Sequence, residues 1–311
     1  MGIIVVGTAF VDIKGFPEGA YIPTGRNVGD VKYIHGGVAR NVVEDIANLE
    51  LRPTYVGIVD DTPLGKDVLD KIKRHKINTD YVLVRPDGMG LWLAVFDSNG
   101  EVAGSISKRP DSYVLLELLE EKGDEIFKDG DSVVVQVDLH KDIVKKVLEL
   151  AEKHHVKTFA VVANMTIAAE RRDMLQRFDC FICNKQEAGL LFLDDYKGKN
   201  AEQMQQILAD KVKRANIPSM VVTMSEEGAV YADREGNSGF CLAKDVQVKD
   251  TTGAGDAFCA GVASGLTYGK TLGEAVEIGT MLSASVIVSD ENVCPRFLPE
   301  EFGLCYPKKN D

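Results

Sequence analysis

The sequence predicts an α/β fold in which helices cover both faces of a mostly parallel, doubly wound sheet. Short apolar runs rich in β-branched residues alternate with longer segments of helical period along most of the chain. Such alternation is typical of β-α-β units, whose strands pair in parallel. The 311 residues are enough for one large domain of this class or for two smaller domains.

The predicted strands and helices follow one another in the order expected for such units. The runs predicted as strands are residues 3–7, 54–59, 132–137, 158–162, 180–183 and 220–223. The segments predicted as helices between them are residues 38–49, 64–75, 142–154, 167–177, 185–193 and 201–215. Two further predicted helices, residues 253–266 and 271–288, are rich in small residues, which allows close packing against a neighbour.

Two stretches interrupt this alternation. Residues 13–35 are rich in Gly, Pro and Tyr at a place where a helix is expected, and residues 90–108 alternate like a β-hairpin closed by Asn99 and Gly100. The two stretches predict either a small inserted sheet or an antiparallel extension of the main sheet, and the residue patterns favour neither. An inserted sheet would lie over the carboxyl ends of the parallel strands, where ligands bind in open α/β folds.

The composition favours a small-molecule partner over a nucleic acid or a membrane. The 48 acidic and 36 basic residues give a net charge of -12, which repels a phosphate backbone or an anionic bilayer. No apolar run approaches the roughly 18 residues that span a bilayer, and the N-terminus lacks a basic segment and a cleavage site, so we expect a cytoplasmic protein. The six cysteines are too few for a disulfide scaffold, and we expect Cys180 and Cys183 to pack in the core.

The most informative segment runs from Asp250 to Asp256, where a polar, glycine-rich turn leads directly into an apolar helix. Gly253 and Gly255 allow the backbone to bend, so that N–H groups of the turn converge on an anion such as a phosphate. An aspartate beside a bound phosphate is suited to take a proton from a hydroxyl nucleophile. The alternative is that Thr252 or Asp256 only caps the helix and complements its dipole.

A second glycine-led helix start lies near the N-terminus. Gly36 and Gly37 precede a helical segment that contains Asn41, and Asp12 follows the first predicted strand. Carboxylate and amide groups at strand ends are suited to bind sugar hydroxyls. Both residue types also occur as ordinary turn and cap residues.

With these segments, the sequence resembles the PfkB carbohydrate kinases, also called the ribokinase-like family. The glycine-glycine segment with Asn matches residues 36–41, and the D-T-x-G-A-G-D signature matches residues 250–256. Two further motifs follow in the right order, N-x-x-E at Asn184 and Glu187 and V-T-x-G-x-x-G at residues 222–228. The resemblance covers most of the chain. It implies a ribokinase-like three-layer sandwich over residues 1–311, with a β-lid inserted at about residues 13–35 and 90–108.

The resemblance also implies a function and a role for each motif. It implies a kinase that uses ATP, Mg²⁺ and, in many members, a monovalent cation to phosphorylate a hydroxymethyl group of a small sugar or nucleoside. Asp256 would be the catalytic base, with the N–H groups of Gly253, Ala254 and Gly255 as the anion hole. The residues implied for the nucleotide are Asn184, Glu187, Thr223, Ser225, Gly228 and Thr252, with Glu187 also serving the metal. Those implied for the acceptor are Asp12, Gly36, Gly37, Arg40 and Asn41.

Two departures from the family pattern bear on specificity. Ser225 replaces a glycine of the nucleotide segment, so its Cβ would narrow or redirect the loop near the nucleotide. Arg40 directly before Asn41 resembles the pseudouridine kinases of the family, and it would either reach a base carbonyl or pair with an acid. A pseudouridine-like nucleoside is therefore the favoured acceptor, with a small free sugar as the alternative.

Two other functions are also consistent with the sequence. A sugar phosphate acceptor would need a cationic site, which Lys14, Lys108 or Arg109 would supply. A regulatory protein that binds a nucleotide or sugar without turnover would keep the same fold. Independently of the function, lid strands around Trp92 and Phe96 would pair two subunits into a homodimer, because an exposed apolar sheet face needs cover.

Overall fold

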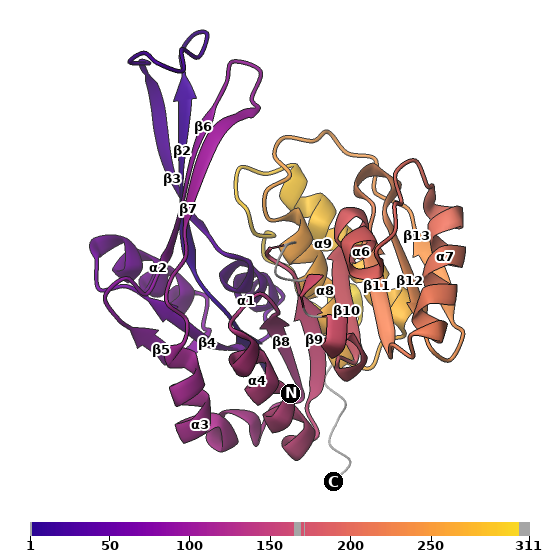
Figure 1. Ribbon diagram of the computed structural model, residues 1–311. Helices are drawn as coiled ribbons and strands as arrows, with labels where there is room; N and C mark the ends of the chain where they lie inside the picture. The colour runs from indigo at the N-terminus through magenta and orange to yellow at the C-terminus, as the bar shows by residue number, and fades with distance from the viewer. Residues whose placement is uncertain (1, 165–168, 171, 305–311) are drawn as a thin grey trace.

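The computed structural model describes residues 2–164, 169, 170 and 172–304, and its elements are labelled in Figure 1. The larger of two sheets contains β1 (Ile3–Val6), β4 (Thr54–Val59), β5 (Asn78–Val84), β8 (Ser132–Gln136), β9 (Lys157–Val161), β10 (Cys180–Asn184), β11 (Ser219–Thr223), β12 (Ala229–Asp233) and β13 (Ser238–Cys241). The smaller sheet contains β2 (Phe10–Pro17), β3 (Gly29–Gly36), β6 (Gly90–Phe96) and β7 (Val102–Lys108). The described α-helices are α1 (Val38–Asn48), α2 (Pro63–Arg74), α3 (Val114–Phe127), α4 (Lys141–His154), α6 (Lys185–Phe192), α7 (Ala201–Arg214), α8 (Ala254–Thr267) and α9 (Leu272–Ile287).

The larger sheet has the strand order β13-β12-β11-β10-β9-β8-β1-β4-β5. In this order the seven strands from β11 to β5 pair in parallel with one another, and β12 and β13 add two antiparallel strands at the β11 edge. Helices lie on both faces of this sheet (Figure 1). The predicted doubly wound α/β fold is therefore confirmed.

The apolar core has two halves, one on each face of this sheet. Successive strand residues alternate between them, so that Ile4 packs in one half and Ile3 in the other. The first half lies under α3, α4, α6 and α7, and the second under α1, α2, α8 and α9. Cys183 is buried in the first half and Cys180 in the second, which confirms that both cysteines pack in the core.

The smaller sheet has the strand order β3-β2-β6-β7 and projects away from the main body (Figure 1). β6 and β7 form an antiparallel hairpin whose connection contains Asn99 and Gly100, with a φ of 80° at Gly100. The two stretches that interrupt the predicted alternation therefore build a separate sheet. The antiparallel extension of the main sheet also exists, but β12 and β13 form it.

Several elements of the structure are absent from the prediction, namely α3, β5 and the pair β12 and β13. α3 contains Gly123, a residue that disfavours helix interiors, yet an added Cβ there would lie 2.4 Å from Leu150 Cδ1. The predicted helix at residues 167–177 lies partly outside the described residues, and its last part is a 3₁₀ helix, Arg172–Arg177. Among the described helices, none has the length and apolar character needed to cross a membrane.

Candidate active site

Two helices that begin at glycine meet at the centre of the candidate site. Gly37 is the N-cap of α1 with a φ of 94°, and Gly253 is the N-cap of α8 with a φ of 83°. Asn41 Nδ2, in the first turn of α1, donates a hydrogen bond to Asp256 Oδ2, in the first turn of α8, over 2.6 Å. The structure thus joins the two glycine-led motifs of the sequence at the aspartate predicted as the base.

The turn before α8 requires glycine at position 253. Its φ is positive, and an added Cβ would lie 2.0 Å from the backbone oxygen of Asn292. Asp250 Oδ1 stabilises the same turn by accepting hydrogen bonds from Thr252 N at 2.9 Å and Thr252 Oγ1 at 2.7 Å. The backbone of this loop is therefore fixed in advance of any ligand.

The N–H groups of this turn differ in their availability. The Ala254 N–H donates to the backbone oxygen of Thr251 over 3.2 Å. The N–H groups of Gly253 and Gly255 have no hydrogen-bond acceptor within the described part of the chain. Ala254 thus departs from the predicted anion hole because its N–H closes the turn, and the two glycine N–H groups are left to bind an anion.

The carboxyl group of Asp256 is half-buried beside Asn41. Burial raises the pKa of Asp256 to about 7, although the Asn41 hydrogen bond and the charge of Arg40 oppose the rise. Asp12 lies near enough for its negative charge to raise the pKa further. An aspartate in this environment exchanges a proton near neutral pH, which is the property a general base requires.

The predicted acceptor residues gather around Asp12. Its side chain is buried, and burial raises its pKa while the charges of Lys14 and Arg40 lower it. Gly36 lies against it, since an added Cβ there would be 2.7 Å from both carboxylate oxygens of Asp12. A side chain at position 36 would therefore displace the carboxylate that we expect to bind hydroxyl groups.

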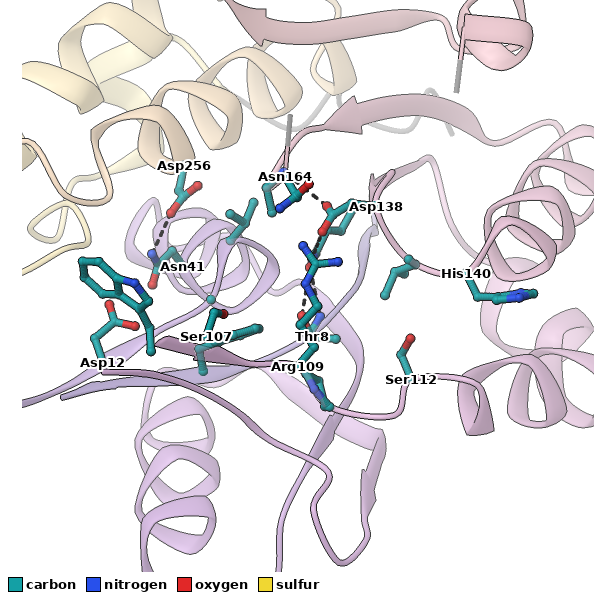
Figure 2. Close-up of a pocket in the computed structure, with 18 of the residues that line it drawn as sticks. Thr8, Asp12, Asn41, Ser107, Arg109, Ser112, Asp138, His140, Asn164 and Asp256 are labelled. Carbon is teal, nitrogen blue, oxygen red and sulfur yellow. Dashed lines mark hydrogen bonds between the residues drawn. The ribbon is translucent and has the colours of Figure 1, made fainter. Parts of the chain in front are cut away.

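Several of the predicted site residues line one cavity of about 650 Å³, large enough for a small organic molecule. Its lining includes, at one end, Asp12, Gly37, Asn41, Thr252, Gly253 and Asp256. Figure 2 shows the side chains of Asp12, Asn41 and Asp256 together on one side of the cavity. Of the predicted catalytic and acceptor residues, Gly36, Arg40, Ala254 and Gly255 do not line it.

Sequence reasoning missed the polar residues at the other end of this cavity. Gln136 Oε1 accepts from Thr8 N at 3.1 Å and from Thr8 Oγ1 at 3.2 Å, and Gln136 Nε2 donates to Asp138 Oδ2 over 3.2 Å. Thr8 follows β1 and Asp138 follows β8, so the cavity lies at the carboxyl ends of two adjacent parallel strands. Each residue alone looks like an ordinary turn residue, and only the pairing of β1 with β8 reveals the chain of hydrogen bonds.

Asp138 and Arg109 place opposite charges near each other at this end. Burial raises the pKa of Asp138, whereas the hydrogen bonds from Gln136 Nε2 and Ala163 N and the charge of Arg109 lower it. Arg109 lies just after β7 and lines the cavity together with the aromatic residues Phe10 and Trp92. Figure 2 places Arg109 and Asp138 apart from Asp12 and Asp256. The cavity therefore has two polar ends with aromatic surface in its lining.

Arg40 does not take the position expected of an acceptor ligand. Its side chain is fully buried, is paired with Glu44, and donates to the backbone oxygens of His35 and Gly36. It also donates to Asn292 Oδ1 over 3.3 Å. Of the two roles considered for Arg40, the structure shows the pairing with an acid, because its guanidinium is bound by these partners and does not line the cavity.

The N-x-x-E motif forms the start of α6. Asn184 Oδ1 accepts from Glu187 N at 2.8 Å, and Glu187 Oε2 accepts from Asn184 N at 2.8 Å. This reciprocal capping box satisfies two N–H groups of the helix start. The motif therefore has a structural role, and one oxygen of Glu187 remains for other contacts.

The remaining nucleotide residues lie near the ends of β10 and β11. Asn184, Thr223 and Ser225 line a second cavity of about 990 Å³. Ser225 has a φ of 54°, in the left-handed region that favours glycine. The glycine usual at this position would adopt this φ without the steric cost that the serine side chain brings. Gly228 does not line this cavity. Its role is structural, because an added Cβ there would lie 2.0 Å from the backbone oxygen of Cys241.

A family model described as pfkB family carbohydrate kinase matches residues 2–298 of the chain. The chain belongs to the PfkB family of carbohydrate kinases. Its relatives include a guanosine-inosine kinase from Exiguobacterium acetylicum, 37% identical over 93% of this chain and 95% of the relative. The pseudouridine kinase of Escherichia coli is 24% identical over 92% of this chain and 90% of its own length.

Solved structures confirm the ribokinase-like fold. Arabidopsis thaliana ribokinase, solved in complex with ribose and ATP, superposes with a TM-score of 0.82 at 20% identity and covers 98% of this chain and 99% of that one. The match to the family model confirms the sequence-based assignment to the PfkB family. The chain is an ATP-dependent kinase of the family that phosphorylates nucleosides or sugars.

The residues present fit the divalent cation that accompanies ATP in such an enzyme. Burial raises the pKa of Glu187, and the negative charge of Asp138 adds to this, so a nearby cation would stabilise both carboxylates. Among the described residues no group of three or more His, Cys, Asp or Glu forms a metal cluster. Mg²⁺ does not need such a cluster, since it commonly binds one or two carboxylates, several waters and the substrate phosphates.

Proposed function

We propose that this kinase phosphorylates the 5′-hydroxymethyl group of a 6-oxopurine nucleoside such as guanosine or inosine. The observation that carries the proposal is that Arg109 and Asp138, a cation and an anion, both line the end of the cavity away from Asp256. A free sugar would need only the end formed by Asp12, Asn41 and Asp256. A nucleoside would use both ends, and the cavity of about 650 Å³ has room for it.

The charges of this pair match the edge of a 6-oxopurine. An arginine donates well to O6 and N7, the acceptors that guanine and hypoxanthine share. A carboxylate accepts from N1–H and, in guanine, from the 2-amino group. Adenine keeps the acceptor N7, but it has an amino group in place of O6 and an acceptor at N1, so the contacts to O6 and to N1–H would be lost. The 37% identity to a guanosine-inosine kinase supports the same acceptor class.

The reaction at the other end follows from the position of Asp256. Asp256 accepts the proton of the 5′-hydroxyl, and the oxygen forms a bond to the γ-phosphorus of ATP. The bond from that phosphorus to the β,γ-bridging oxygen breaks, and its electron pair leaves with ADP. The N–H groups of Gly253 and Gly255 bind oxygens of the phosphoryl group during transfer. Mg²⁺, when bound near Glu187, would neutralise phosphate charge.

An acceptor panel tests the proposal. We expect ADP release with guanosine and inosine to exceed that with adenosine, pseudouridine and ribose in kcat/KM by at least about tenfold, the value of one or two hydrogen bonds. Assays without Mg²⁺ test whether the reaction requires this metal, and assays without potassium test whether a monovalent cation near residues 250–256 activates it. Cell fractionation tests the proposed cytoplasmic location. Preference for pseudouridine or ribose over guanosine would reject the purine acceptor.

Asp138→Asn is expected to reduce selectivity for the base. The amide cannot replace a carboxylate that accepts two donors, so kcat/KM for guanosine should fall about 10- to 100-fold, in line with a hydrogen bond to a charged group. The value for adenosine should change little, and the guanosine-to-adenosine ratio is the quantity to measure. A parallel loss for both nucleosides would mean that Asp138 does not contact the base.

The structure offers less support for a sugar phosphate acceptor. Of the three cations considered for it, Lys14 is buried and paired with Asp250, and Lys108 pairs with Asp87 over 2.5 Å. Only Arg109 of these three lines the cavity. One cation beside a carboxylate suits a polar base edge better than a phosphate dianion.

The smaller sheet is proposed to act as a lid and as a dimer surface. Its outer face carries a row of side chains, one from each strand, at Tyr33, Ile13, Leu93 and Ile106. Tyr33, Leu93 and Ile106 are exposed, whereas Trp92 lines the cavity and Phe96 stacks on Phe16. The dimer surface is therefore proposed on the face opposite to the residues first considered.

Light scattering tests this pairing. The native protein is expected to have the mass of a dimer, and Ile106→Asp should shift it toward the monomer, because a charge would be buried unpaired in the interface. A monomeric native protein at micromolar concentration would exclude the dimer.

A further inference from the structure

Lys14 is a buried lysine that reaches from the smaller sheet to the loop before α8. The residue is 3% exposed, and its Nζ donates to Thr252 Oγ1 over 3.3 Å and lies 3.5 Å from Asp250 Oδ2. Within the described part of the chain these are its side-chain partners. A lysine ammonium has three N–H donors, so this pair of long contacts leaves donor capacity unused.

The strand register directs Lys14 toward the site. Side chains alternate along β2, so Lys14 lies on the same face as Asp12, one step farther from the acceptor end. Asp12 is paired across the sheet with Trp92, which is paired with Ser107, and all three line the cavity. The face of β2 that carries Lys14 is therefore the face that covers the reacting groups.

The two partners in the ion pair of Lys14 and Asp250 differ in solvent exposure, which is unusual for a buried charge. The side chain of Asp250 is 52% exposed while that of Lys14 is 4% exposed. Burial of an ammonium is unfavourable unless strong partners replace its water, and a half-exposed carboxylate at 3.5 Å replaces little of it. This arrangement lacks the close contacts that would explain the burial of Lys14 on structural grounds alone.

Negative charge predominates where the phosphoryl group must lie. Asp12 and Asp256 line the cavity, Asp250 is hydrogen-bonded to Thr252 of the lining, and ATP would bring further negative charge. Arg40 is committed to Glu44 and to backbone oxygens. Lys14, next to Thr252 and hence next to the free N–H of Gly253, is the cation best placed to offset this charge.

We propose that Lys14 is a further catalytic residue, whose ammonium turns from Asp250 to an oxygen of the phosphoryl group during its transfer from ATP to the acceptor. The proposal rests on the proposed kinase reaction. The bonds that form and break are those described for that reaction, and Lys14 neither gains nor loses a proton. Its contact strengthens as charge spreads over the transferring oxygens, so it should act on kcat more than on either KM.

The test compares Lys14→Met with Asp250→Asn on whichever acceptor the native enzyme turns over best. Lys14→Met should lower kcat about 10²–10³-fold, as loss of one donor to a transition-state oxygen does, with KM values nearly unchanged. Asp250→Asn keeps Lys14 and can still accept both hydrogen bonds from Thr252, so it should cost less than about tenfold. Equal losses in the two variants would mean that the pair only fastens the sheet to the loop, and would overturn the proposal.

A binding measurement separates this proposal from the choice of acceptor. ADP, Mg²⁺ and aluminium fluoride together imitate the phosphoryl group in transfer and need no nucleoside. Calorimetry should show that fluoride tightens ADP binding to the native protein and to Asp250→Asn, but much less to Lys14→Met, with Lys14→Arg in between. An undiminished gain in Lys14→Met would overturn the role of Lys14, whatever acceptor the panel identifies. Unchanged affinity of the variants for ADP alone shows that they are folded.

Discussion

Asp256→Asn is expected to lower kcat by about 10²–10⁴-fold while the protein keeps its fold. The range is that of a positioned general base, and the amide cannot accept the hydroxyl proton. Its oxygen can still accept the 2.6 Å hydrogen bond from Asn41, so the contact between α1 and α8 should survive. Steady-state kinetics at saturating ATP and acceptor measure the effect. A variant with more than about a tenth of the native kcat would remove Asp256 from this role.

The dependence of activity and stability on pH provides the control. With a pKa of about 7, Asp256 must lose its proton to act, so native kcat/KM should rise through pH 7 and level above it. The folded-state pKa lies above the ordinary 3.8, so burial of the carboxylate costs stability that grows as pH rises from 4 to 7. Asp256→Asn should therefore have the higher Tm at pH 8, and the difference should vanish near pH 4. A lower Tm at pH 8 would contradict this assignment.

Arg40→Met is expected to destabilise the protein by about 3–5 kcal/mol, the usual cost of removing one partner of a buried ion pair. The side chain of Glu44 has no exposure, and among the described residues it would keep Lys71 at 3.2 Å and His75 at 3.5 Å. The backbone oxygens of His35 and Gly36 would also lose a donor. Urea unfolding at neutral pH measures the free energy of unfolding.

The matched control is the double variant Arg40→Met, Glu44→Leu. Replacing both charges with apolar side chains removes the unpaired carboxylate, so the double variant should be more stable than the single variant. A loss below about 1 kcal/mol in Arg40→Met, or a double variant less stable than the single one, would show that the buried pair does not stabilise this part of the structure.

Local sequence patterns were sufficient to predict most of the parallel strands of the main sheet and the two helix starts at Gly37 and Gly253. A continuous run of β-branched residues, such as the one within residues 132–136, indicates a strand buried on both faces. The turn at Gly253 could be predicted because its glycines and Asp256 act within one short segment. Even there, the prediction assigned the N–H of Ala254 to the anion, since only coordinates show that Thr251 accepts it.

Features that depend on distant contacts could not be predicted in this way. Arg40 looks like a ligand from its place beside Asn41, and its partner Asn292 lies 252 residues away. The hydrogen bonds from Thr8 to Gln136 join residues 128 positions apart. Lys14 is an ordinary lysine in the sequence, and only the packing of the smaller sheet against the loop before α8 shows that it is buried.

Identification of the reaction product tests the central claim most directly. The protein is incubated with guanosine, ATP and Mg²⁺, and the phosphorylated nucleoside is compared by chromatography with authentic 5′-, 3′- and 2′-monophosphates. The arrangement of Asp256 at one end of the cavity and of Arg109 and Asp138 at the other predicts guanosine 5′-monophosphate. A 2′- or 3′-phosphate, or no phosphorylated nucleoside, would contradict it.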